Sequence, residues 1–430
     1  MKKTLTTCKG NRVLIFCLVI FLSGCGTFRD LKKESAEIEQ TYGLAGKINI
    51  PAPPMGAIVV MLYSQKEGKN EIVACTIATE TGHFTFYRSY GTYFIAAFED
   101  LNDNFSHDPG EKVGYYGAPD AIVMSPKEGA TTTKNTFLNL DFRLASAEQF
   151  LPGFSATVDA GKISRSNFVK IGQICSLDDK IFAPANGSIG YWKPLTFLRD
   201  FGVGVYFLDP YDPKKIPVIF IHGALGSPEG WKKMIAQMDR KKFQPWFYYY
   251  PSGVRLDKTG FVLNEIIKRI HQEYRFKTLY VTAQSMGGLV ARSFIMKNIY
   301  DDKQNYIRLF VSISTPWNGH RLTAKGAERA PAAIPSWHDM VPESPFIRNI
   351  FDNKFPDYLK YHLLFSYRGD CQLLLKNNDG TVELSSELDY RAQDDATQVY
   401  GFDEDHGSII FSQTFIDYYN RILKESFSKQ

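Results

Sequence analysis

One serine stands between a strand-like run and a helix-like run in the segment VTAQSMGGLV, residues 281–290. A serine hydroxyl becomes a nucleophile only when it is exposed, aimed and paired with a base. A sharp strand-to-helix turn aims it, and such a turn needs small residues two positions before and after the serine. Ala283 and Gly287 occupy these positions, with alanine replacing the first glycine of the usual G-x-S-x-G pattern. The spacing predicts that Ser285 is a nucleophile; the alternative is an ordinary helix start.

A hydrolytic serine also needs N–H groups that stabilise the oxyanion formed when it attacks a carbonyl. The segment HGALGS, residues 222–227, directly follows the apolar run IPVIFI. We therefore expect the backbone N–H groups of Ala224 and Met286 to form an oxyanion hole. The alternative is a glycine-rich turn without a catalytic role.

Chain order predicts the base and the acid. After a nucleophile elbow in an α/β sheet, the acid precedes the histidine. Of the histidines after Ser285, His406 alone follows all predicted strands and precedes the last predicted helix. Asp379, beside Gly380, lies in a turn after the strand-like run YHLLFSYRG and is the predicted acid. Four competing aspartates are interpreted as parts of a solvated loop: Asp394, Asp395, Asp403 and Asp405.

The elements around these residues alternate between strands and helices from residue 216 to the C-terminus. Apolar runs such as KTLYVTAQ and IRLFVSIST alternate with patterns of helical spacing such as FVLNEIIKRIHQEY. This alternation predicts a mostly parallel sheet with helices on both faces and a ligand site at the carboxyl ends of its strands. The long connection at about 320–360 predicts a cap or lid. Four large side chains either line an acyl pocket or pack this cap: Trp317, Trp337, Met340 and Phe346.

Five segments of residues 216–430 resemble the α/β-hydrolases of the lipase and esterase type, in their residues and their order: HGALGS, AQSMGGLVAR, STPWNGH, NDGTVELSS and DHGS. The resemblance implies an ester or lipid substrate and an acyl-enzyme on Ser285, with His406 as base and Asp379 as its orienting acid. It implies neither a metal nor a cofactor. Two other classes stay open: an acyltransferase that uses the same serine, and a non-catalytic binding lipoprotein on a hydrolase scaffold.

Short β-like runs separated by Gly, Pro, Asn and Asp fill residues 43–144 and predict an all-β sandwich. The run TGHFTFYRSYGTYFIAAFEDLN resembles transthyretin-like or carboxypeptidase-regulatory-like sandwiches. Residues 145–215 are expected to be a linker and the early strands of the hydrolase domain. The hydrolase domain itself is expected to span residues 216–430.

One loop of the predicted sandwich, DLNDNFSHDPGE, is rich in oxygen-bearing side chains. Five of them have the spacing of calcium ligands: Asp100, Asn102, Asn104, Asp108 and Glu111. However, Phe105 stands where a calcium loop of the EF-hand type needs glycine, and the flanking runs are strand-like. We favour the alternative that these side chains form Asx turns with their own backbone.

The first 24 residues have the pattern of a secretory signal, with basic residues followed by the apolar run VLIFCLVIFL. The segment from Leu22 to Cys25 resembles a bacterial lipoprotein box, which implies that Cys25 is lipidated and anchors the protein to a membrane of the cell envelope. Gly26 favours the outer membrane over the inner one. Residues 25–42 are polar and predict a tether. The alternative is a soluble secreted protein in which Cys25 has no role.

Charge and cysteine content limit the remaining possibilities. Four of the 50 basic residues lie in the first 24 residues, and the remaining 46 balance the 46 acidic residues. This balance argues against nucleic acid as a partner. After the signal, Cys75, Cys175 and Cys371 remain beside Cys25, and their spacing fits no zinc site. An oxidising compartment permits one disulfide among them, and buried thiols are the alternative.

Overall fold

The structure is a computed structural model. It describes residues 24–428 apart from 51–53, 67, 80–81, 117–119, 125–138, 147–149, 160–162, 165–168, 331, 370, 372 and 375–376. The chain forms two compact units. The smaller unit comprises residues 37–170 and 197–204, and the larger unit comprises the rest of the described chain.

The smaller unit consists of two β-sheets with strand orders β4-β1-β8 and β10-β3-β2-β5-β6-β9, with β7 also paired to β5. The main pairs, β1 with β4 and β2 with β3 and β5, are antiparallel. The strands are β1 (Tyr42–Asn49), β2 (Ala57–Lys66), β3 (Lys69–Ile77), β4 (His83–Arg88), β5 (Gly91–Asp100), β6 (Lys112–Tyr116), β7 (Ile122–Met124), β8 (Phe142–Arg143), β9 (Ala145–Ser146) and β10 (Ile163–Ser164).

Strand alternation places the core of the smaller unit between its sheets. Val60 and Leu62 of β2 are buried in one apolar cluster with residues of β1 and β4. Val59 and Met61, which point to the other face, are buried in a second cluster that includes Val158. The N-terminal region is therefore all-β with apolar side chains on both faces of β2, as the sequence predicts. The resemblance to transthyretin-like sandwiches stays a prediction.

The larger unit is built on an eight-stranded sheet of order β11-β12-β14-β13-β15-β16-β17-β18. From β14 to β18 every neighbouring pair is parallel. The strands are β11 (Val169–Ile174), β12 (Val203–Phe207), β13 (Ile216–Ile221), β14 (Phe243–Tyr249), β15 (Leu279–Gln284), β16 (Ile307–Ile313), β17 (Lys360–Ser366) and β18 (Gln398–Phe402). The central strands are almost completely buried, which explains their continuous apolar runs.

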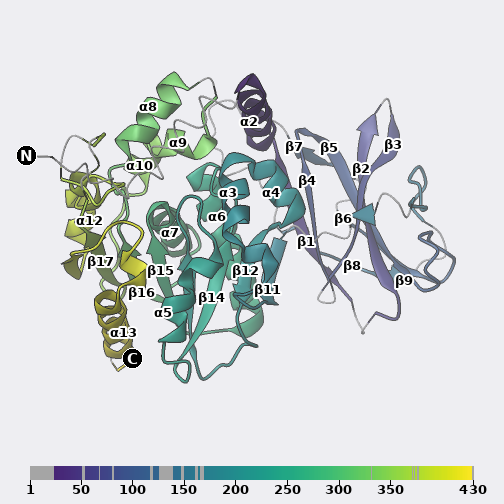
Figure 1. Ribbon diagram of the computed structural model, residues 1–430. Coiled ribbons are helices and arrows are strands. Elements are labelled where there is room, and N and C mark those ends of the chain that lie inside the picture. Colours follow the sequence, from purple (N-terminus) through teal and green to yellow (C-terminus); the bar gives the residue numbers. More distant parts are fainter. Residues whose placement is uncertain are drawn as a thin grey trace, which may run out of the picture. The chain divides into compact units, whose positions relative to one another are not determined.

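Helices cover both faces of this sheet (Figure 1). On one face, Phe220 and Tyr280 pack in a single cluster with residues of α5 and α13. On the other, α6 and α7 pack on each other, and α7 contacts β13, β15 and β16. The helices are α2 (Gly24–Glu39), α3 (Pro184–Trp192), α4 (Pro194–Asp200), α5 (Lys232–Ala236), α6 (Leu256–Tyr274), α7 (Met286–Met296), α8 (Arg321–Arg329), α9 (Pro335–Asp339), α10 (Pro345–Asn349), α11 (Leu384–Glu387), α12 (Tyr390–Asp395) and α13 (Gln413–Phe427).

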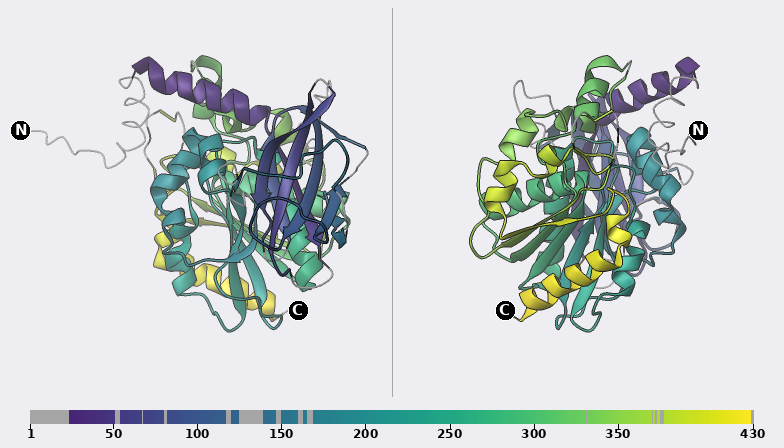
Figure 2. Two further views of the ribbon diagram at one scale, coloured as in Figure 1. Left: turned by 90° about the vertical axis from the view of Figure 1, so that its right-hand side faces the viewer. Right: turned by 60° about the vertical axis from the view of Figure 1, so that its left-hand side comes forward.

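The segment expected to be a tether, residues 25–42, is a helix over most of its length. Helix α2 is drawn in purple in Figure 2. Leu31 of α2 is buried in a cluster with Tyr191 and Ile334. The Glu34 carboxylate accepts hydrogen bonds from the N–H groups of Leu195 and Thr196, at 2.9 and 3.2 Å. Glu34 thus caps the first turn of α4, so the expectation of a polar tether was wrong for the described residues.

A second local expectation also needs correction. The pattern of the run SPEGWKKMIAQMD, residues 227–239, predicts one capped helix. Instead, residues Pro228–Trp231 form a 3₁₀ turn and α5 spans only five residues. Ser227 accepts no capping hydrogen bond through its side chain. Gly230 in the first turn disfavours a longer α-helix there, whereas Pro228 at the first helical position is compatible with one.

The predicted signal at residues 1–24 lies almost entirely outside the described residues, which begin at Gly24. Within the part of the chain that the structure describes, no helix is both long enough and apolar enough to span a bilayer.

Candidate active site

Ser285 lies at the turn between β15 and α7 in a strained backbone conformation. Its φ of 53° and ψ of −133° lie outside the regions that most residues adopt. Two backbone hydrogen bonds hold the turn: the Ser285 N–H donates to Ile313 O at 2.8 Å, and the Gly288 N–H donates to Ser285 O at 2.9 Å. The turn raises the hydroxyl at the carboxyl end of the parallel sheet, where α/β proteins bind ligands.

Close packing explains the small residues around the serine. A Cβ atom at Gly287 would lie 2.5 Å from the carbonyl oxygen of His222, and one at Gly223 would lie 2.9 Å from Ser285 Cβ. Ala283 is completely buried and pairs with Ile221 of β13. The motif HGALGS therefore packs directly against the serine, and both glycines are required by the contact.

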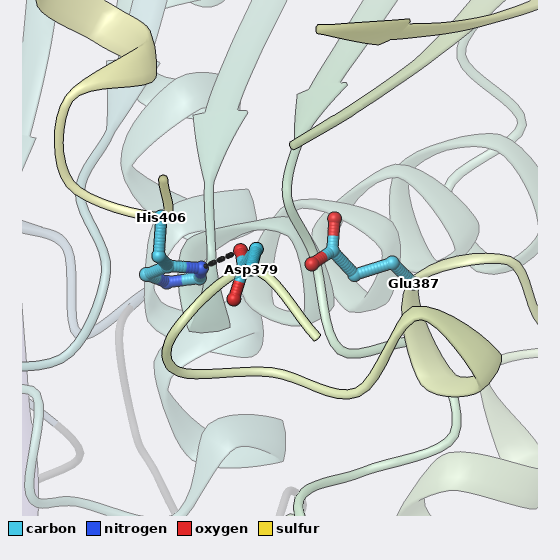
Figure 3. Close-up of side chains that lie close together, drawn as sticks. All are labelled: Asp379, Glu387 and His406. Carbon is cyan, nitrogen blue, oxygen red and sulfur yellow. Dashed lines mark hydrogen bonds and ion pairs between the residues drawn. The ribbon is translucent and has the colours of Figure 1, made fainter. Parts of the chain in front are cut away.

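His406 and Asp379 meet Ser285 through a continuous chain of hydrogen bonds. His406 Nε2 lies 2.9 Å from Ser285 Oγ. On the other side of the ring, His406 Nδ1 lies 2.5 Å from Asp379 Oδ2, and Figure 3 shows this pair. Because a carboxylate only accepts, Nδ1 carries the proton, and Nε2 is free to accept the serine proton. The His406 N–H donates to Asp379 O at 2.9 Å, and Gln284 Nε2 donates to His406 O at 3.1 Å. These bonds tie the three loops together.

Asp379 is fully buried and held as a carboxylate. Besides His406, the Ser366 hydroxyl donates to Oδ2 at 2.9 Å, and the N–H groups of Thr381 and Val382 donate to Oδ1 at 3.0 and 2.7 Å. Burial alone would raise the pKa of Asp379, but His406 and these donors outweigh it and lower the pKa to about 2. Asp379 is therefore negatively charged at neutral pH and can orient the imidazole.

The competing acids and histidines lie elsewhere. Asp395 pairs with Arg292, and Asp394 pairs with Lys354. Asp405 accepts hydrogen bonds from the N–H groups of two neighbours. His320 caps α8, and its Nε2 lies 2.7 Å from Thr381 O. None of these groups bonds to Ser285 or His406 among the described residues.

Two N–H groups beside Ser285 are suited to hold an oxyanion. Met286 is the first residue of α7, so its N–H has no acceptor within the helix. The Ala224 N–H also has no acceptor among the described residues. The loop that carries Ala224 is held by a hydrogen bond from the Leu225 N–H to Ser252 Oγ at 3.1 Å and by the left-handed backbone of Leu225, with φ of 61°. Both N–H groups expected for the oxyanion hole are thus available.

His222 packs against the loop that carries Ala224. Its ring stacks on Tyr250 at 4.3 Å between centroids, and the Tyr250 hydroxyl donates to His222 O at 2.6 Å. Burial lowers the pKa of His222 to about 4, despite the opposing effect of a bond to Gly223 O. His222 is therefore neutral at physiological pH and serves to pack the loop.

The segment expected to be a cap contains α8, α9 and α10. Its buried Asp339 accepts hydrogen bonds from Arg255 Nε at 2.9 Å and from the Leu256 N–H at 2.6 Å, which fixes the segment to the start of α6. Trp317 is fully buried against Phe310 and Tyr361, so it packs the core. Whether the segment covers the active site stays a prediction.

The remaining large side chains of this segment are also packed. Trp337 Nε1 donates to the Tyr191 hydroxyl at 2.6 Å, and its ring contacts Gly326 closely. Met340 and Phe346 are buried. These contacts favour packing over the lining of an acyl pocket for these three side chains.

The oxygen-rich loop of the smaller unit bonds largely to itself. Asp100 accepts from the N–H groups of Asn104 and Phe105, and Glu111 accepts from those of Leu101 and Asp108. Asn102 Nδ2 donates to Asp108 Oδ2 at 2.8 Å. Two Asx turns lie in the loop: Asn102 Oδ1 accepts from the Asn104 N–H, and Asn104 Oδ1 accepts from the Ser106 N–H. Calcium binding by the candidate ligands stays a prediction.

Among the cysteines whose side chains the structure describes, none is cross-linked to another: Cys75 and Cys175 are buried, and Cys371 is half-buried. Cys25 lies in the first turn of α2, and the structure describes nothing of its side chain. Its lipidation stays a prediction.

One residue at the site was missed in the sequence. Glu387 of α11 is almost completely buried, and its carboxyl group points toward Asp379 (Figure 3). A carboxyl oxygen of each acid and a ring nitrogen of His406 lie within 4.8 Å of one another. No local motif marks Glu387, because its contact with Asp379 arises only from the return of the chain after the turn at Gly380.

The strand order, the elbow and the carboxyl-end site define an α/β-hydrolase fold, and comparisons with known proteins agree with this class. A model of the family described as "Alpha/beta hydrolase of unknown function (DUF915)" matches residues 254–340. The strand topology and the family match therefore confirm the expected fold class: a mostly parallel sheet with helices on both faces, preceded by an all-β region.

Several solved structures are similar to the chain at low identity. The mature lipase BlEst2 of Bacillus licheniformis is 20% identical with a TM-score of 0.41, over 51% of this chain and 97% of that chain. The lin2722 product of Listeria innocua is 17% identical with a TM-score of 0.38, over 48% and 92% of the two chains. A structure from a study of Nitrososphaera gargenis carboxylesterases is 9% identical with a TM-score of 0.37, over 54% and 98%. No curated protein matches the chain.

Proposed function

We propose that the protein is a serine hydrolase that cleaves carboxylic esters through Ser285, His406 and Asp379. The observation that carries this proposal is the unbroken chain of hydrogen bonds, 2.9 Å from Ser285 Oγ to His406 Nε2 and 2.5 Å from His406 Nδ1 to Asp379 Oδ2. An ionised Asp379 favours the proton of His406 on Nδ1, which is the tautomer that acyl transfer needs. The strained turn at Ser285 supports it further, because such strain persists where it aims a functional group.

In the proposed mechanism, Ser285 Oγ attacks the ester carbonyl carbon while His406 Nε2 accepts the serine proton. The N–H groups of Ala224 and Met286 donate to the oxyanion that develops. When the tetrahedral intermediate collapses, the C–O bond to the alcohol breaks, and His406 returns the proton to the leaving oxygen. Water then attacks the acyl-enzyme by the same sequence and releases the acid. Asp379 keeps the imidazole in the required tautomer throughout.

The direct test is activity on p-nitrophenyl esters of increasing chain length, combined with labelling by a fluorophosphonate. Ser285→Ala should lose both labelling and turnover, the latter by on the order of a million-fold. Ser385→Ala is the matched control, because Ser385 is an exposed serine on α11 and should keep both. Activity that survives in Ser285→Ala would refute the assignment. A wild type that neither reacts with the probe nor turns over any ester would favour the non-catalytic scaffold.

The acceptor of the acyl group is decided by product analysis. We propose water as the acceptor, although His406 would activate the O–H group of an alcohol in the same way, so the acceptor has to be measured. Reaction mixtures with and without an added alcohol should both release free acid. Dominant transfer to the alcohol would assign the chain as an acyltransferase that uses the same serine.

We further propose that the enzyme is anchored in the bacterial cell envelope by a lipid on Cys25, where it meets ester or lipid substrates. The support is the lipoprotein-like segment from Leu22 to Cys25. Cells that express the chain should incorporate labelled palmitate into it, and Cys25→Ala should remove the label. A label that persists in the variant would contradict the anchor, and fractionation of the outer and inner membranes would test its location.

A further inference from the structure

Glu387 is a buried acid that the proposed reaction does not use. Its side chain is only 1% exposed, and it lies at the end of the short helix α11. Neither of its carboxyl oxygens receives a hydrogen bond of ordinary geometry from the described residues, and no Lys or Arg among them forms an ion pair with it. Its carboxyl group faces Asp379, which in turn faces His406 (Figure 3). A buried carboxylate without a cation would be very costly.

The groups around Asp379 and Glu387 determine which of the two acids can be charged. Asp379 accepts four hydrogen bonds and is ionised. Glu383, on the same turn, has Arg321 at 3.7 Å. His320 Nδ1 accepts from the Leu322 N–H while Nε2 donates to Thr381 O, so this ring is neutral. His406 is already bonded to Asp379. No neighbouring cation is therefore left to neutralise a second carboxylate beside Asp379.

Two carboxylates in contact in a buried site cannot both be ionised. We propose that Glu387 is a positioning residue that keeps its proton at neutral pH and shares it with Asp379 in a hydrogen bond, so that the pair carries one negative charge. Burial and the charge of Asp379 raise the pKa of Glu387 well above its usual range, in agreement with this geometry. The protonation of Glu387 stands on its own contacts, whereas its effect on turnover rests on the proposed function.

The consequence for the site is electrostatic. An ionised Glu387 would place a second negative charge near His406 and would hold the imidazole in its protonated form, which cannot accept the proton of Ser285. A neutral Glu387 avoids this second charge. It also donates a hydrogen bond to the Asp379 carboxylate from the side opposite His406, which helps to hold that carboxylate in place. The pair thus keeps the base available at neutral pH.

The first experiment measures the proton itself and needs no activity. Infrared difference spectra at neutral pH, wild type minus Glu387→Gln, should show the C=O stretch of a protonated carboxylic acid. Glu383→Gln, the control on the same turn, should change only carboxylate bands, because Glu383 is ion-paired. If Glu387→Gln also removes only carboxylate bands, Glu387 is ionised and the proposal is overturned.

The second experiment measures the pH dependence of kcat/KM on an ester. Glu387→Gln keeps a neutral donor and should retain activity within about threefold and an unchanged acid limb. Glu387→Leu lacks the donor, so turnover should fall about tenfold and the acid limb should move to higher pH. A shift to lower pH in Glu387→Gln would mean that a charge had been removed, and equal losses in both variants without any shift would mean a purely structural role. Either outcome refutes positioning. An inactive wild type whose infrared band is present would instead refute only the proposed function.

A second, independent observation concerns the amino ends of the strands in the same sheet, opposite the end that carries Ser285. A cavity of about 1060 Å³ lies at the amino ends of β13, β15, β16 and β17. Glu425 is the one acidic residue that lines it among the described residues. Six basic side chains line it: Lys214, Lys215, Arg275, Lys277, Arg308 and Lys360. Of these, only Lys215 has an acidic partner within 4.0 Å in the described chain.

We infer that this cavity binds a compound with several phosphate charges, because a concave surface lined by one sign of charge concentrates the field. The chain as a whole is nearly neutral after its first 24 residues, so the cluster is a local excess. The Arg308 guanidinium lies 4.8 Å from the centroid of the Tyr358 ring, which helps to hold it in the cavity. The site is at the far edge of the sheet from Ser285, so it is separate from the proposed chemistry.

Calorimetry with pyrophosphate tests free phosphate, and flotation with phosphatidylglycerol or phosphatidylcholine vesicles tests a lipid headgroup. The triple variant Lys277→Gln, Arg308→Gln, Lys360→Gln should bind at least about tenfold more weakly than the wild type at low salt. A matched triple variant at basic residues outside the cavity should bind as the wild type does: Lys232→Gln, Lys233→Gln, Lys241→Gln. Any lipid anchor is present in the wild type and in both triple variants, so it does not contribute to the difference in binding between them. Equal binding by both variants, or no binding of either probe, would refute the inference.

Discussion

Gly223 offers the sharpest test of how the active site is packed. Its missing side chain leaves room for Ser285, because a Cβ atom there would lie 2.9 Å from Ser285 Cβ and 3.4 Å from Ser285 Oγ. Carbon atoms in ordinary contact are about 3.5 to 4.0 Å apart, so Gly223→Ala must separate the two groups by roughly 0.6 to 1.1 Å. The strained turn at Ser285 and the stacked His222 leave little freedom on either side.

A displacement of this size is enough to break the bond from Ser285 Oγ to His406 Nε2, which is 2.9 Å long in the structure. Misplacement by about 1 Å typically costs about 100-fold in rate, and overpacking costs about 1 to 3 kcal/mol of stability. We therefore expect kcat/KM for a p-nitrophenyl ester to fall about 100-fold in Gly223→Ala while the protein remains folded. Circular dichroism and thermal unfolding of the same samples separate the two effects.

Gly230 provides the matched control, since a Cβ atom at this position would meet no heavy atom within 4 Å. Gly230→Ala should keep both activity and stability. If Gly223→Ala retains activity within about threefold of Gly230→Ala, the close contact between the HGALGS loop and the serine does not position the nucleophile, and the reasoning is wrong.

Three further outcomes are expected. The pKa of Asp379 falls from its usual 3.8 to about 2 on folding, so the carboxylate contributes about 2 kcal/mol of stability above pH 4 that is lost as the pH falls toward 2. The free energies of unfolding in urea of the wild type and Asp379→Asn should therefore converge over this range. A constant difference between them would contradict the prediction. Arg292→Met leaves buried Asp395 without its partner and should cost about 3 to 5 kcal/mol in urea unfolding, with recovery in Arg292→Met/Asp395→Leu; a loss below about 1 kcal/mol would disprove the pairing argument. EDTA should leave turnover per folded molecule unchanged, and a loss at constant folded fraction would overturn the metal-free mechanism.

The elements that carry the proposed chemistry were predictable because their signals are local. The elbow at Ser285 needs small neighbours at fixed spacing, and these are visible in any sequence. The choice of Asp379 and His406 used the order serine, acid, histidine together with the predicted strands, and the turn at Gly380 favoured Asp379 over four other aspartates. The structure then brings Ser285, His406 and Asp379 into contact.

The features that were missed depend on packing between distant segments. Glu387 has no motif, since its burial beside Asp379 is set by the path of the chain through α11. Helix α2 was taken for a tether because its composition is polar. Its buried residues Leu31 and Ile38 are seven positions apart, which is helical spacing, but two apolar residues were too weak a signal without the surface that buries them. Short strands such as β7 and β10 were missed for a similar reason, since two or three residues show no periodicity.

If Cys25 carries a lipid, as we propose, the docking of α2 limits how far the larger unit can lie from the bilayer. Glu34 and Leu31 fix the helix to the larger unit, and Leu31 is only six positions from Cys25. A helix rises about 1.5 Å per residue, so this segment spans about 9 Å. An acyl chain on Cys25 would therefore hold the larger unit close to the bilayer and in one orientation. A long flexible tether would instead let the unit move and turn freely. Its substrates would then be molecules in or beside that same leaflet, and lengthening the segment before Leu31 with a flexible insert should widen the range of esters that the enzyme reaches.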